Sequence, residues 1–373
     1  MRILLTGGGT AGHINPAIAI AEVLREYDKK SEILFVGRVG GNENRLVKNS
    51  GLKLRTLHIR GIERKLTVEN IKSLFLAIKS VSSAKRIIKD FNPDIIIGTG
   101  GYVSFPCLRG GIALKIPTVI HESNVLPGLV TRILAKKCSC VLVNMEGTKK
   151  YLSEKARVEV VGNPLRRGFN EMSRDEARRK LGLKKSDFFI VSFGGSIGAE
   201  KLNSTVIEVM KGYCARIPAV KHIHAAGARY YDALEMSEPE LCRGINGCRL
   251  VGYIDNMPTL LRAADLVISR CGAMTLSEIA AVGRAAILIP SPNVADNHQY
   301  KNAKYLEERG AGIMIEERLL DAKALQSKIH SLRTDSEMRK SIAQRIKDFG
   351  KDNSTELILN VILDLTSKGL HRE

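Results

Sequence analysis

Two glycine-rich segments are the parts of this sequence best suited to chemistry. Gly7–His13 (GGGTAGH) follows a short apolar run and precedes a helix-like stretch, and Gly194–Gly198 (GGSIG) has the same setting later in the chain. Glycine lets the backbone approach a ligand closely, and the free N–H groups of a helix start favour an anion or a polar substrate. His13 is the functional candidate in the first segment, and Ser196 adds a hydroxyl donor to the second.

Neither segment carries the signature of a familiar nucleotide loop. No Gly-Lys-Ser/Thr follows, which excludes a P-loop, and neither forms a clean GxGxxG with an acidic residue after the next strand, which disfavours NAD. The alternative is two tight strand–helix turns without a ligand. Because each turn opens a separate half of the chain, we favour a ligand bound in a cleft.

Polar residues also follow buried strands in the first half of the chain. Gly98–Tyr102 (GTGGY) and His121–Asn124 (HESN) each come directly after an apolar run. Ligands of an open parallel sheet sit beyond the carboxyl ends of its strands. We therefore expect His13, Glu122 and Asn124 to line one side of the cleft, with the histidine of HESN as a structural residue.

The second half offers two further polar segments, Ser269–Glu278 (SRCGAMTLSE) and Asp296–Ala303 (DNHQYKNA). Glu278, near a helix start, could accept two ribose hydroxyls; the alternative is an ordinary first-turn acid stabilised by the helix dipole. The amide and imidazole groups of the other segment suit sugar hydroxyls. The alternative there is a capping box formed by Asp296 and Gln299, and both interpretations can hold together.

These segments require a framework of alternating strands and helices. Short apolar runs without polar alternation are typical of strands buried on both faces of a parallel sheet. They lie at Ile3–Leu5, Ile33–Val36, Ile95–Ile97, Thr118–Ile120 and Val141–Val143, and the pattern restarts at Phe188–Ser192, His222–Ala225, Leu266–Ile268 and Ala286–Ile289. Helix-like stretches separate them, so we predict an α/β protein of two doubly wound, Rossmann-like domains that face each other across a cleft.

The predicted N-terminal domain spans residues 1–163 and the C-terminal domain residues 164–350. Gly162–Phe169, with its glycine and proline, is the linker candidate. Residues 351–373 form a final segment whose apolar positions recur at helical spacing. This amphipathic helix could pack back across the domain junction.

Composition limits the class of protein. The chain has 373 residues, 44% hydrophobic and 26% charged, which suits a two-domain globular protein with a large core. The net charge is +19 and most of the excess lies in residues 1–163, which suits anionic partners or reflects a generally basic surface. Only 5% of residues are aromatic, tryptophan is absent and no nucleic-acid motif occurs, so we expect no nucleic-acid partner.

The sequence also predicts the environment of the protein. No apolar run is long enough to span a membrane, and the N-terminus resembles a first strand rather than a signal peptide. Seven scattered cysteines form no zinc pattern and are expected to be reduced thiols. No Asp-x-Asp-type metal motif lies in either glycine loop, so we expect neither a metal nor a cofactor.

The motifs GGGTAGHINPA, GTGGY, HESN, GNPLR, GGSIGA, GYIDNM, CGAMTLSE and DNHQYKNA occur in this order between Met1 and Ala303. The ordered set resembles the MurG family of bacterial UDP-N-acetylglucosamine transferases. The resemblance implies the GT-B fold, with the lipid acceptor on the N-terminal domain and UDP-GlcNAc mainly on the C-terminal domain. Two positions depart from the family pattern: Ala11 replaces a common glycine, which requires a negative φ there, and Ala285 replaces a common proline.

The resemblance also implies roles for individual residues. Thr10, Ala11, Gly12 and His13 would border the donor sugar and diphosphate, and Asn124 would contact the sugar. Arg166 and Ser196 would serve the nucleotide and phosphate, and Ile254 would meet uracil through its backbone. Gln299 would bind GlcNAc. The run that would hold the diphosphate and ribose, with Glu278 on the ribose hydroxyls, comprises Ala273, Met274, Thr275, Leu276, Ser277 and Glu278.

By the same resemblance, the 4-hydroxyl of MurNAc in undecaprenyl-pyrophosphoryl-MurNAc-pentapeptide attacks the anomeric carbon with inversion, forming a peptidoglycan precursor needed for cell shape and division. Helix-start N–H groups would stabilise the departing UDP without a metal. His13 is the first candidate for the general base and Glu122 the second. A UDP-GlcNAc epimerase or another lipid glycosyltransferase of this fold is the alternative.

A polyprenyl acceptor implies a peripheral enzyme on the cytoplasmic face of an anionic membrane. A helix-like stretch predicted over Thr67–Asp90 could provide the contact, because apolar residues recur at near-helical spacing within a basic collar. The alternative is a core helix with a solvated outer face. The apolar residues are Leu66, Ile71, Leu74, Phe75, Ile78 and Val81, and the basic ones are Arg64, Lys65, Lys72, Lys79, Lys85 and Arg86.

Overall fold

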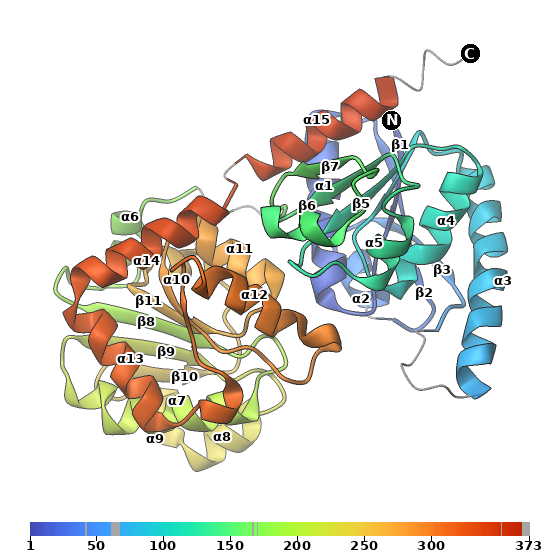
Figure 1. The fold of residues 1–373 in the computed structure, drawn as a ribbon. Coiled ribbons are helices and arrows are strands. Elements are labelled where there is room, and N and C mark those ends of the chain that lie inside the picture. The colour runs from blue at the N-terminus through green and yellow to red at the C-terminus, as the bar shows by residue number, and fades with distance from the viewer. Residues whose placement is uncertain (42, 61–67, 166–167, 170, 352, 368–373) are drawn as a thin grey trace. The chain divides into compact units, whose positions relative to one another are not determined.

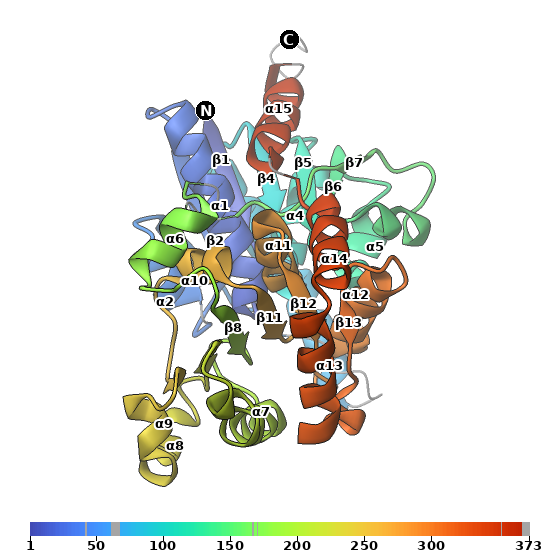
Figure 2. The ribbon, with the colours of Figure 1, turned by 90° about the vertical axis from the view of Figure 1, so that its left-hand side faces the viewer.

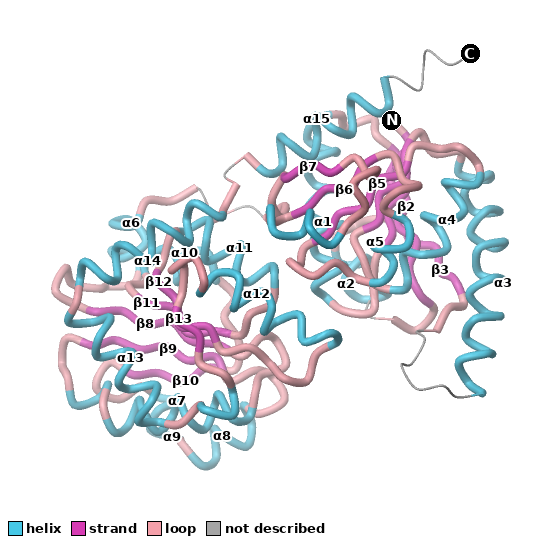
Figure 3. Tube along the Cα trace, viewed as in Figure 1, coloured by secondary structure: helices cyan, strands magenta, loops and turns pink. Residues whose placement is uncertain are grey.

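A computed structural model describes residues 1–41, 43–60, 68–165, 168–169, 171–351 and 353–367. In helix α3 (Val68–Phe91), it describes the side chains from residue 79 onwards. The chain divides into two compact units. Unit 1 contains residues 1–165 and 353–373, and unit 2 contains residues 166–352. Each unit has strands at its centre and helices around them (Figures 1 and 3).

Unit 1 is built on a parallel seven-stranded sheet in the order β3-β2-β1-β4-β5-β6-β7. Its strands are β1 (Arg2–Thr6), β2 (Glu32–Arg38), β3 (Lys53–Leu57), β4 (Ile95–Gly98), β5 (Thr118–Glu122), β6 (Cys140–Val143) and β7 (Val158–Val160). Its helices are α1 (Ala11–Tyr27), α2 (Glu43–Asn49), α3 (Val68–Phe91), α4 (Phe105–Ala113), α5 (Leu129–Leu134) and α15 (Ser354–Ser367), with short 3-10 helices η1 (Tyr102–Ser104) and η2 (Glu146–Tyr151).

Apolar side chains cover both faces of this sheet. In β1, Ile3, Leu4 and Leu5 are all fully buried. Ile3 and Leu5 pack in a cluster with α1 and α15, whereas Leu4 packs in the opposite cluster with α3, α4 and α5. Successive side chains of a strand point to opposite faces, so an unbroken apolar run is what a sheet covered on both sides requires.

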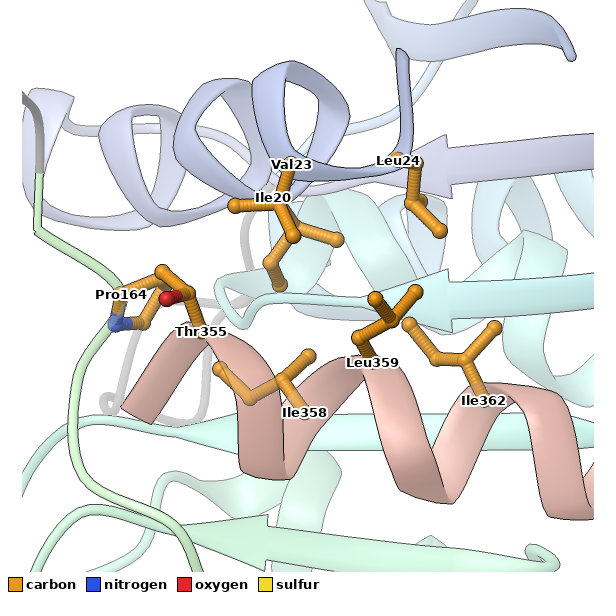
Figure 4. Close-up of a pocket in the computed structure, with 8 residues that line it drawn as sticks. All are labelled: Ile20, Val23, Leu24, Pro164, Thr355, Ile358, Leu359 and Ile362. Atoms are coloured by element: carbon orange, nitrogen blue, oxygen red, sulfur yellow. The ribbon is translucent and has the colours of Figure 1, made fainter. Parts of the chain in front are cut away.

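Helix α15 returns to unit 1 after the chain has built unit 2. Figure 4 shows its side chains opposite those of α1, with Pro164 at the end of the seam. The Ser354 hydroxyl donates to the Asn163 carbonyl oxygen over 3.0 Å. The hollow between the helices is lined by Ile20, Val23, Leu24, Pro164, Thr355, Ile358, Leu359 and Ile362, so it is a packing seam and not a site for a polar substrate.

Unit 2 has a parallel six-stranded sheet in the order β10-β9-β8-β11-β12-β13. Its strands are β8 (Phe188–Phe193), β9 (Val220–Ala225), β10 (Cys248–Val251), β11 (Leu266–Ser269), β12 (Ala285–Leu288) and β13 (Ile313–Met314). Its helices are α6 (Arg174–Lys180), α7 (Glu200–Gly212), α8 (Tyr231–Ser237), α9 (Pro239–Arg243), α10 (Met257–Ala263), α11 (Ala273–Val282), α12 (His298–Glu307), α13 (Ala322–Thr334) and α14 (Ser336–Phe349), and its 3-10 turns are η3 (Cys214–Arg216), η4 (Ala295–Asn297) and η5 (Glu317–Leu319).

Helices cover both faces of the second sheet as well. One face packs against α7 and α13 through a single apolar cluster. Figure 2 shows α10 and α11 on the other side of β8 and β11 from α7. In both units the first central strand runs directly into a glycine-rich turn and then a helix, so the carboxyl ends of the central strands carry the candidate functional segments.

Candidate active site

The first glycine run is shaped by the segments packed against it. A Cβ atom on Gly7 would lie 2.2 Å from the Thr99 hydroxyl oxygen, and one on Gly8 would lie 1.7 Å from a carboxylate oxygen of Glu43. Neither position has room for a side chain. The Gly8 N–H donates to the Gly100 carbonyl oxygen over 3.3 Å, which ties the loop to the end of β4.

Thr10 is the N-cap of α1, with extended φ and ψ of −140° and 157°. Ala11 is the first helical residue and does not have a positive φ, so the alanine side chain is tolerated at this position. The first N–H groups of a helix have no acceptor within it. The N–H groups of Ala11 and Gly12 therefore have no acceptor within the helix.

His13 pairs with the loop that follows β4. Its Nδ1 lies 3.2 Å from the Thr99 carbonyl oxygen, and the Thr99 hydroxyl donates to the His13 carbonyl oxygen over 2.6 Å. A Cβ on Gly100 would lie 2.7 Å from His13 Nδ1, and one on Gly101 would lie 3.2 Å from its Cδ2. Gly100 and Gly101 of the GTGGY motif thus make room for the imidazole. Thr99 was not among the predicted site residues, although it belongs to the same motif.

Glu122 and Asn124 lie at the end of β5 and in the loop after it. The prediction that the whole HESN motif follows the strand is wrong, because β5 continues through Glu122. Glu122 is 4% exposed and both of its carboxylate oxygens are engaged. One accepts from the backbone and side-chain N–H groups of Asn124, and the other from Gly128 N–H at 2.9 Å and the Thr131 hydroxyl at 2.8 Å. Glu122 therefore holds the loop that carries Asn124.

His121 is fully buried beside Glu122. Its Nε2 lies 3.0 Å from the Gly162 carbonyl oxygen, and burial lowers the pKa of its imidazole. Its position agrees with the structural role expected for it.

In unit 2, the loop Gly194–Gly198 follows β8 and leaves Ser196 exposed. Gly198 has a φ of +91°, and a Cβ there would lie 2.0 Å from the Ala226 carbonyl oxygen. The Ala228 N–H donates to the Ser196 carbonyl oxygen over 3.3 Å. The loops after β8 and β9 therefore pack backbone to backbone, which only glycine at these positions permits.

A buried polar chain supports the loop after β9. His222 Nε2 and His224 Nδ1 lie 2.7 and 2.8 Å from the Ser192 hydroxyl, and His224 Nε2 lies 3.1 Å from Asn203 Oδ1. The Asn203 amide then donates to the Ala226 carbonyl oxygen over 2.9 Å. Burial lowers the pKa of His222 to about 3 and that of His224 to about 4, so both are neutral near pH 7.

The run from Ala273 to Glu278 opens α11, whose N-cap is Gly272. Ala273 and Leu276 are 7% and 1% exposed and pack in the core, so the backbone of Ala273 is what it can offer to a ligand. Met274, Thr275, Ser277 and Glu278 are half-buried. Glu278 lies in the second turn, so the alternative of a first-turn acid is wrong.

Gln299 joins two loops of unit 2. Its Oε1 accepts from Cys271 N–H at 3.1 Å and from Ser291 N–H at 2.9 Å. The alternative of a capping box is wrong: α12 begins at His298 with Asn297 as its N-cap, and Asp296 has a φ of +56°. Because the amide oxygen is occupied, the amide nitrogen is the part of Gln299 left for a ligand.

Two further predicted residues complete the set. Ile254 is 6% exposed, so a contact with the uracil base of a nucleotide would have to use the backbone of Ile254. Arg166 lies outside the described residues. Among the residues that the structure describes, no group of three or more His, Cys, Asp or Glu side chains is placed to hold a metal ion.

Glu43 is a further residue in contact with the first glycine loop, and it was not predicted from the sequence. It is fully buried, and its carboxylate accepts the Gly9 N–H at 2.8 Å. The available signal was a further glycine-rich stretch, Gly37–Gly41, two residues before it. That stretch covers the end of β2 and the turn after it, and it was not recognised as part of the site.

Two doubly wound parallel sheets, each with a glycine turn and a helix start at its carboxyl edge, form the architecture of the GT-B fold, which two-domain glycosyltransferases have. The models of the glycosyltransferase family 28 N-terminal and C-terminal domains match residues 3–143 and 189–357. The chain belongs to glycosyltransferase family 28.

Individual relatives extend this comparison over the whole chain. Proteins from Acetivibrio thermocellus and Caldanaerobacter subterraneus subsp. tengcongensis are each 39% identical over 98% of this chain, covering 98% and 100% of their own lengths. Both are named UDP-N-acetylglucosamine–N-acetylmuramyl-(pentapeptide) pyrophosphoryl-undecaprenol N-acetylglucosamine transferase.

Solved structures support the same fold. The crystal structure of MurG from Acinetobacter baumannii matches with a TM-score of 0.79 at 25% identity, over 97% of this chain and 99% of that chain. A UDP-GlcNAc 2-epimerase from Neisseria meningitidis matches with a TM-score of 0.65 at 13% identity, over 98% of this chain and 100% of that one, which shows a shared fold alone.

Proposed function

We propose that this protein transfers GlcNAc from UDP-GlcNAc to the MurNAc 4-hydroxyl of undecaprenyl-pyrophosphoryl-MurNAc-pentapeptide, with inversion at the anomeric carbon. The observation that carries the proposal is the 39% identity, over 98% of the chain, to relatives named for this transfer. The product is a lipid-linked disaccharide precursor of peptidoglycan, which connects the reaction to cell-wall growth, cell shape and division.

His13 is the general base in this proposal. If its Nδ1–H donates to the Thr99 carbonyl oxygen, 3.2 Å away, then Nε2 carries the lone pair that can take a proton from the acceptor hydroxyl. Glu122 was the second candidate. Its two oxygens already accept hydrogen bonds from Asn124, Gly128 and Thr131, so proton uptake there would disrupt the loop that it holds.

Unit 2 holds the donor in this proposal. The N–H groups at the start of α11 and around Ser196 face the diphosphate and stabilise the charge that develops as UDP leaves. Glu278 accepts the ribose hydroxyls, Ile254 meets uracil through its backbone, and Arg166 assists at the nucleotide. Gln299 donates its amide N–H to GlcNAc, because its Oε1 is already bound by two backbone N–H groups.

Unit 1 holds the acceptor. The segment Thr10–His13 supplies helix-start N–H groups and the base, and Asn124 is held at the carboxyl edge of the same sheet. Bound groups near a helix start gain from both the unpaired N–H groups and the helix dipole.

We propose that unit 1 also contacts an anionic membrane surface on the cytoplasmic side. In α5, Leu129 is 58% and Ile133 is 48% exposed, and their spacing of four residues places them on one face of the helix. Exposed Arg132, Lys136 and Lys137 lie on or directly after this helix. Exposed apolar side chains with adjacent cations suit insertion among acidic headgroups.

Helix α3 lies on the same face of the sheet as α5 (Figure 1). Its described end carries exposed Lys79 and Arg86 and half-buried Val81 and Lys85. The remaining residues of the predicted apolar and basic strip, Arg64, Lys65, Leu66, Ile71, Lys72, Leu74, Phe75 and Ile78, lie outside the residues or side chains that the structure describes. Within the described residues, no helix is both long and apolar enough to cross a membrane.

Transfer of labelled GlcNAc from UDP-GlcNAc to a short-chain analogue of the lipid acceptor tests the reaction. We expect a labelled disaccharide lipid that forms only when both substrates are present. Conversion of UDP-GlcNAc to another sugar nucleotide without acceptor would instead identify an epimerase and overturn the proposal.

A liposome assay tests the membrane contact. We expect sedimentation with vesicles that contain phosphatidylglycerol, weaker sedimentation with phosphatidylcholine alone, and reduced binding of Leu129→Ser/Ile133→Ser. An exposed pair elsewhere, Met236→Ser/Leu319→Ser in unit 2, is the matched control. Equal binding by all three proteins would exclude α5 as the contact.

A further inference from the structure

Glu43 lies beneath the first glycine loop, on an element that contributes none of the predicted site residues. It is the first residue of α2 and is fully buried. Its Oε1 accepts the Gly9 N–H over 2.8 Å, whereas its Oε2 is buried without a hydrogen-bond partner among the described residues. A buried polar atom without a partner lowers stability, so this carboxylate is a poor choice for stability alone.

Three glycines from three segments leave space for this side chain. A Cβ on Gly8 would lie 1.7 Å from Oε1, and one on Gly41 would lie 1.7 Å from Oε2. Gly37, in β2, would place a Cβ 2.9 Å from the Cβ of Glu43. The β1–α1 loop, the end of β2 and the β2–α2 loop are therefore all shaped around one carboxylate.

The hydrogen bond between Gly9 N–H and Glu43 fixes the position of the β1–α1 loop. Gly9 has a φ of +85°, a region that glycine enters readily, so its own backbone preference does not hold it there. Its N–H is held by Glu43 and that of Gly8 by the Gly100 carbonyl oxygen. Both glycine amides are thus used within the protein, and the next free N–H groups are those at the start of α1.

We infer that Glu43 is a positioning residue for transfer. It holds Gly9 so that the α1 start and the His13 imidazole keep the geometry that the acceptor needs. This inference rests on the proposed function. Glu43 acts through the loop, because its hydrogen bond is with the backbone of Gly9.

This role requires a hydrogen-bond acceptor on the side chain of residue 43 and does not require a negative charge there. Glu43→Gln keeps an oxygen for Gly9 and removes the charge, whereas Glu43→Met keeps a similar volume and removes the acceptor. A negative charge next to a segment suited to anions would even oppose an anionic acceptor. We therefore expect the glutamine variant to function and the methionine variant to fail.

The experiment compares both variants with the wild-type chain in the GlcNAc transfer assay. We expect Glu43→Met to lower kcat/KM for the lipid acceptor by about 10- to 100-fold, as for a buried N–H group that loses its acceptor, and Glu43→Gln by less than about threefold. The KM for UDP-GlcNAc should change less, because unit 2 holds the nucleotide in the proposed function. Glu22→Met, on the exposed face of α1, is the matched control.

Hydrogen exchange separates positioning from general destabilisation. The peptide that covers Gly7–His13 should exchange faster in Glu43→Met, while the melting temperature stays close to that of the wild type. A lower melting temperature with unchanged KM values and unchanged loop exchange would reveal a merely structural role and overturn the inference.

Gly41→Ala tests the same contact, first with the carboxylate present and then in the Glu43→Met background. Gly41→Ala should displace Glu43, because the added methyl would overlap Oε2, and should lower kcat/KM for the acceptor. In the Glu43→Met background the same change should have a different, non-additive effect. Additive effects of the two changes would overturn the inference.

The outcomes also separate this inference from the proposed function. If the wild-type chain transfers GlcNAc and Glu43→Met is equally active, the positioning role is wrong and the proposed function stands. Equal damage from the glutamine and methionine variants would mean that charge is required, which also overturns the role. If the wild-type chain transfers no GlcNAc, the proposed function fails, and exchange of the Gly7–His13 peptide still tests the contact between Glu43 and Gly9.

Discussion

His13 and Thr99 form a reciprocal pair across two loops of unit 1. The imidazole Nδ1 lies 3.2 Å from the Thr99 carbonyl oxygen, and the Thr99 hydroxyl donates to the His13 carbonyl oxygen over 2.6 Å. The first contact orients the ring and the second fixes the backbone that carries it. An imidazole oriented in this way presents Nε2 in one direction, which is what the proposed proton transfer from a bound hydroxyl needs.

Replacement of His13 by alanine should remove the base and leave donor binding intact. We expect kcat to fall by about 10²- to 10⁴-fold, the usual contribution of general base catalysis. Calorimetry should show wild-type affinity for UDP, because unit 2 is unchanged. Near-normal turnover of the variant would show that another group takes the proton.

Gly100→Ala should impair catalysis by moving the imidazole. Gly100 has a φ of +105°, and the added methyl would lie 2.7 Å from His13 Nδ1. Gly51→Ala is the matched control, because Gly51 also has a positive φ of +67° but a methyl added there would have no atom within 4 Å. Both should lose about 1 kcal/mol of stability from backbone strain, but only Gly100→Ala should lose kcat. Equal kcat values for the two variants would contradict the steric argument.

Glu122→Gln should destabilise the loop that carries Asn124. The glutamine amide N–H would meet the Gly128 N–H or the Thr131 hydroxyl, which now donate to the carboxylate. We expect a loss of about 1–3 kcal/mol in the free energy of unfolding, measured by urea denaturation. The exposed Glu154→Gln should have no effect. Normal stability with a kcat loss above about 100-fold would instead indicate a direct catalytic role.

Gln299→Glu should separate loop support from sugar recognition. The carboxylate keeps an acceptor for the Cys271 and Ser291 N–H groups but loses the amide donor. We expect calorimetry to show UDP-GlcNAc affinity lowered by about tenfold and UDP affinity lowered less, as for one lost hydrogen bond. Gln299→Leu removes both functions and should also lower the melting temperature. Unchanged UDP-GlcNAc affinity in both variants would exclude contact with the sugar.

Stability should fall in acid because two neutral histidines are buried in unit 2. Desolvation lowers the pKa of His222 to about 3 and that of His224 to about 4, whereas the unfolded value is 6.5. The unfolded state therefore binds more protons below pH 6.5, and stability is lost as the pH falls from 6.5 towards these folded values. Each group can contribute up to about 1.4 kcal/mol per pH unit in that window.

His222→Gln should therefore flatten the dependence of unfolding free energy on pH between 6.5 and 4, even though it lowers stability at pH 7. The exposed His330→Gln should leave the slope unchanged. Urea denaturation at several pH values measures both slopes. Identical slopes for wild type and His222→Gln would contradict the buried neutral state.

The central strands and the glycine turns were predictable from the sequence. Ile3–Leu5 and Ile95–Ile97 were predicted as buried strands because a sheet covered on both faces needs apolar residues at every position. The turn after β1 could be predicted because only glycine tolerates such close backbone approach, and His13 could be predicted because it lies in the first turn of the helix that follows. These signals are local, so a few consecutive residues carry them. Strand β3 (Lys53–Leu57) lacks such an apolar run and was missed.

The partners of these residues were decided by tertiary structure. Glu43 and Gly9 are 34 residues apart, and His13 and Thr99 are 86 apart, so no local pattern records their contacts. The sequence around Gln299 matched a capping box. In the structure its amide oxygen instead accepts hydrogen bonds from the Cys271 and Ser291 N–H groups. Short-range propensities determine which segments become strands, turns and helices, whereas the order of strands in the sheet determines which of their ends meet.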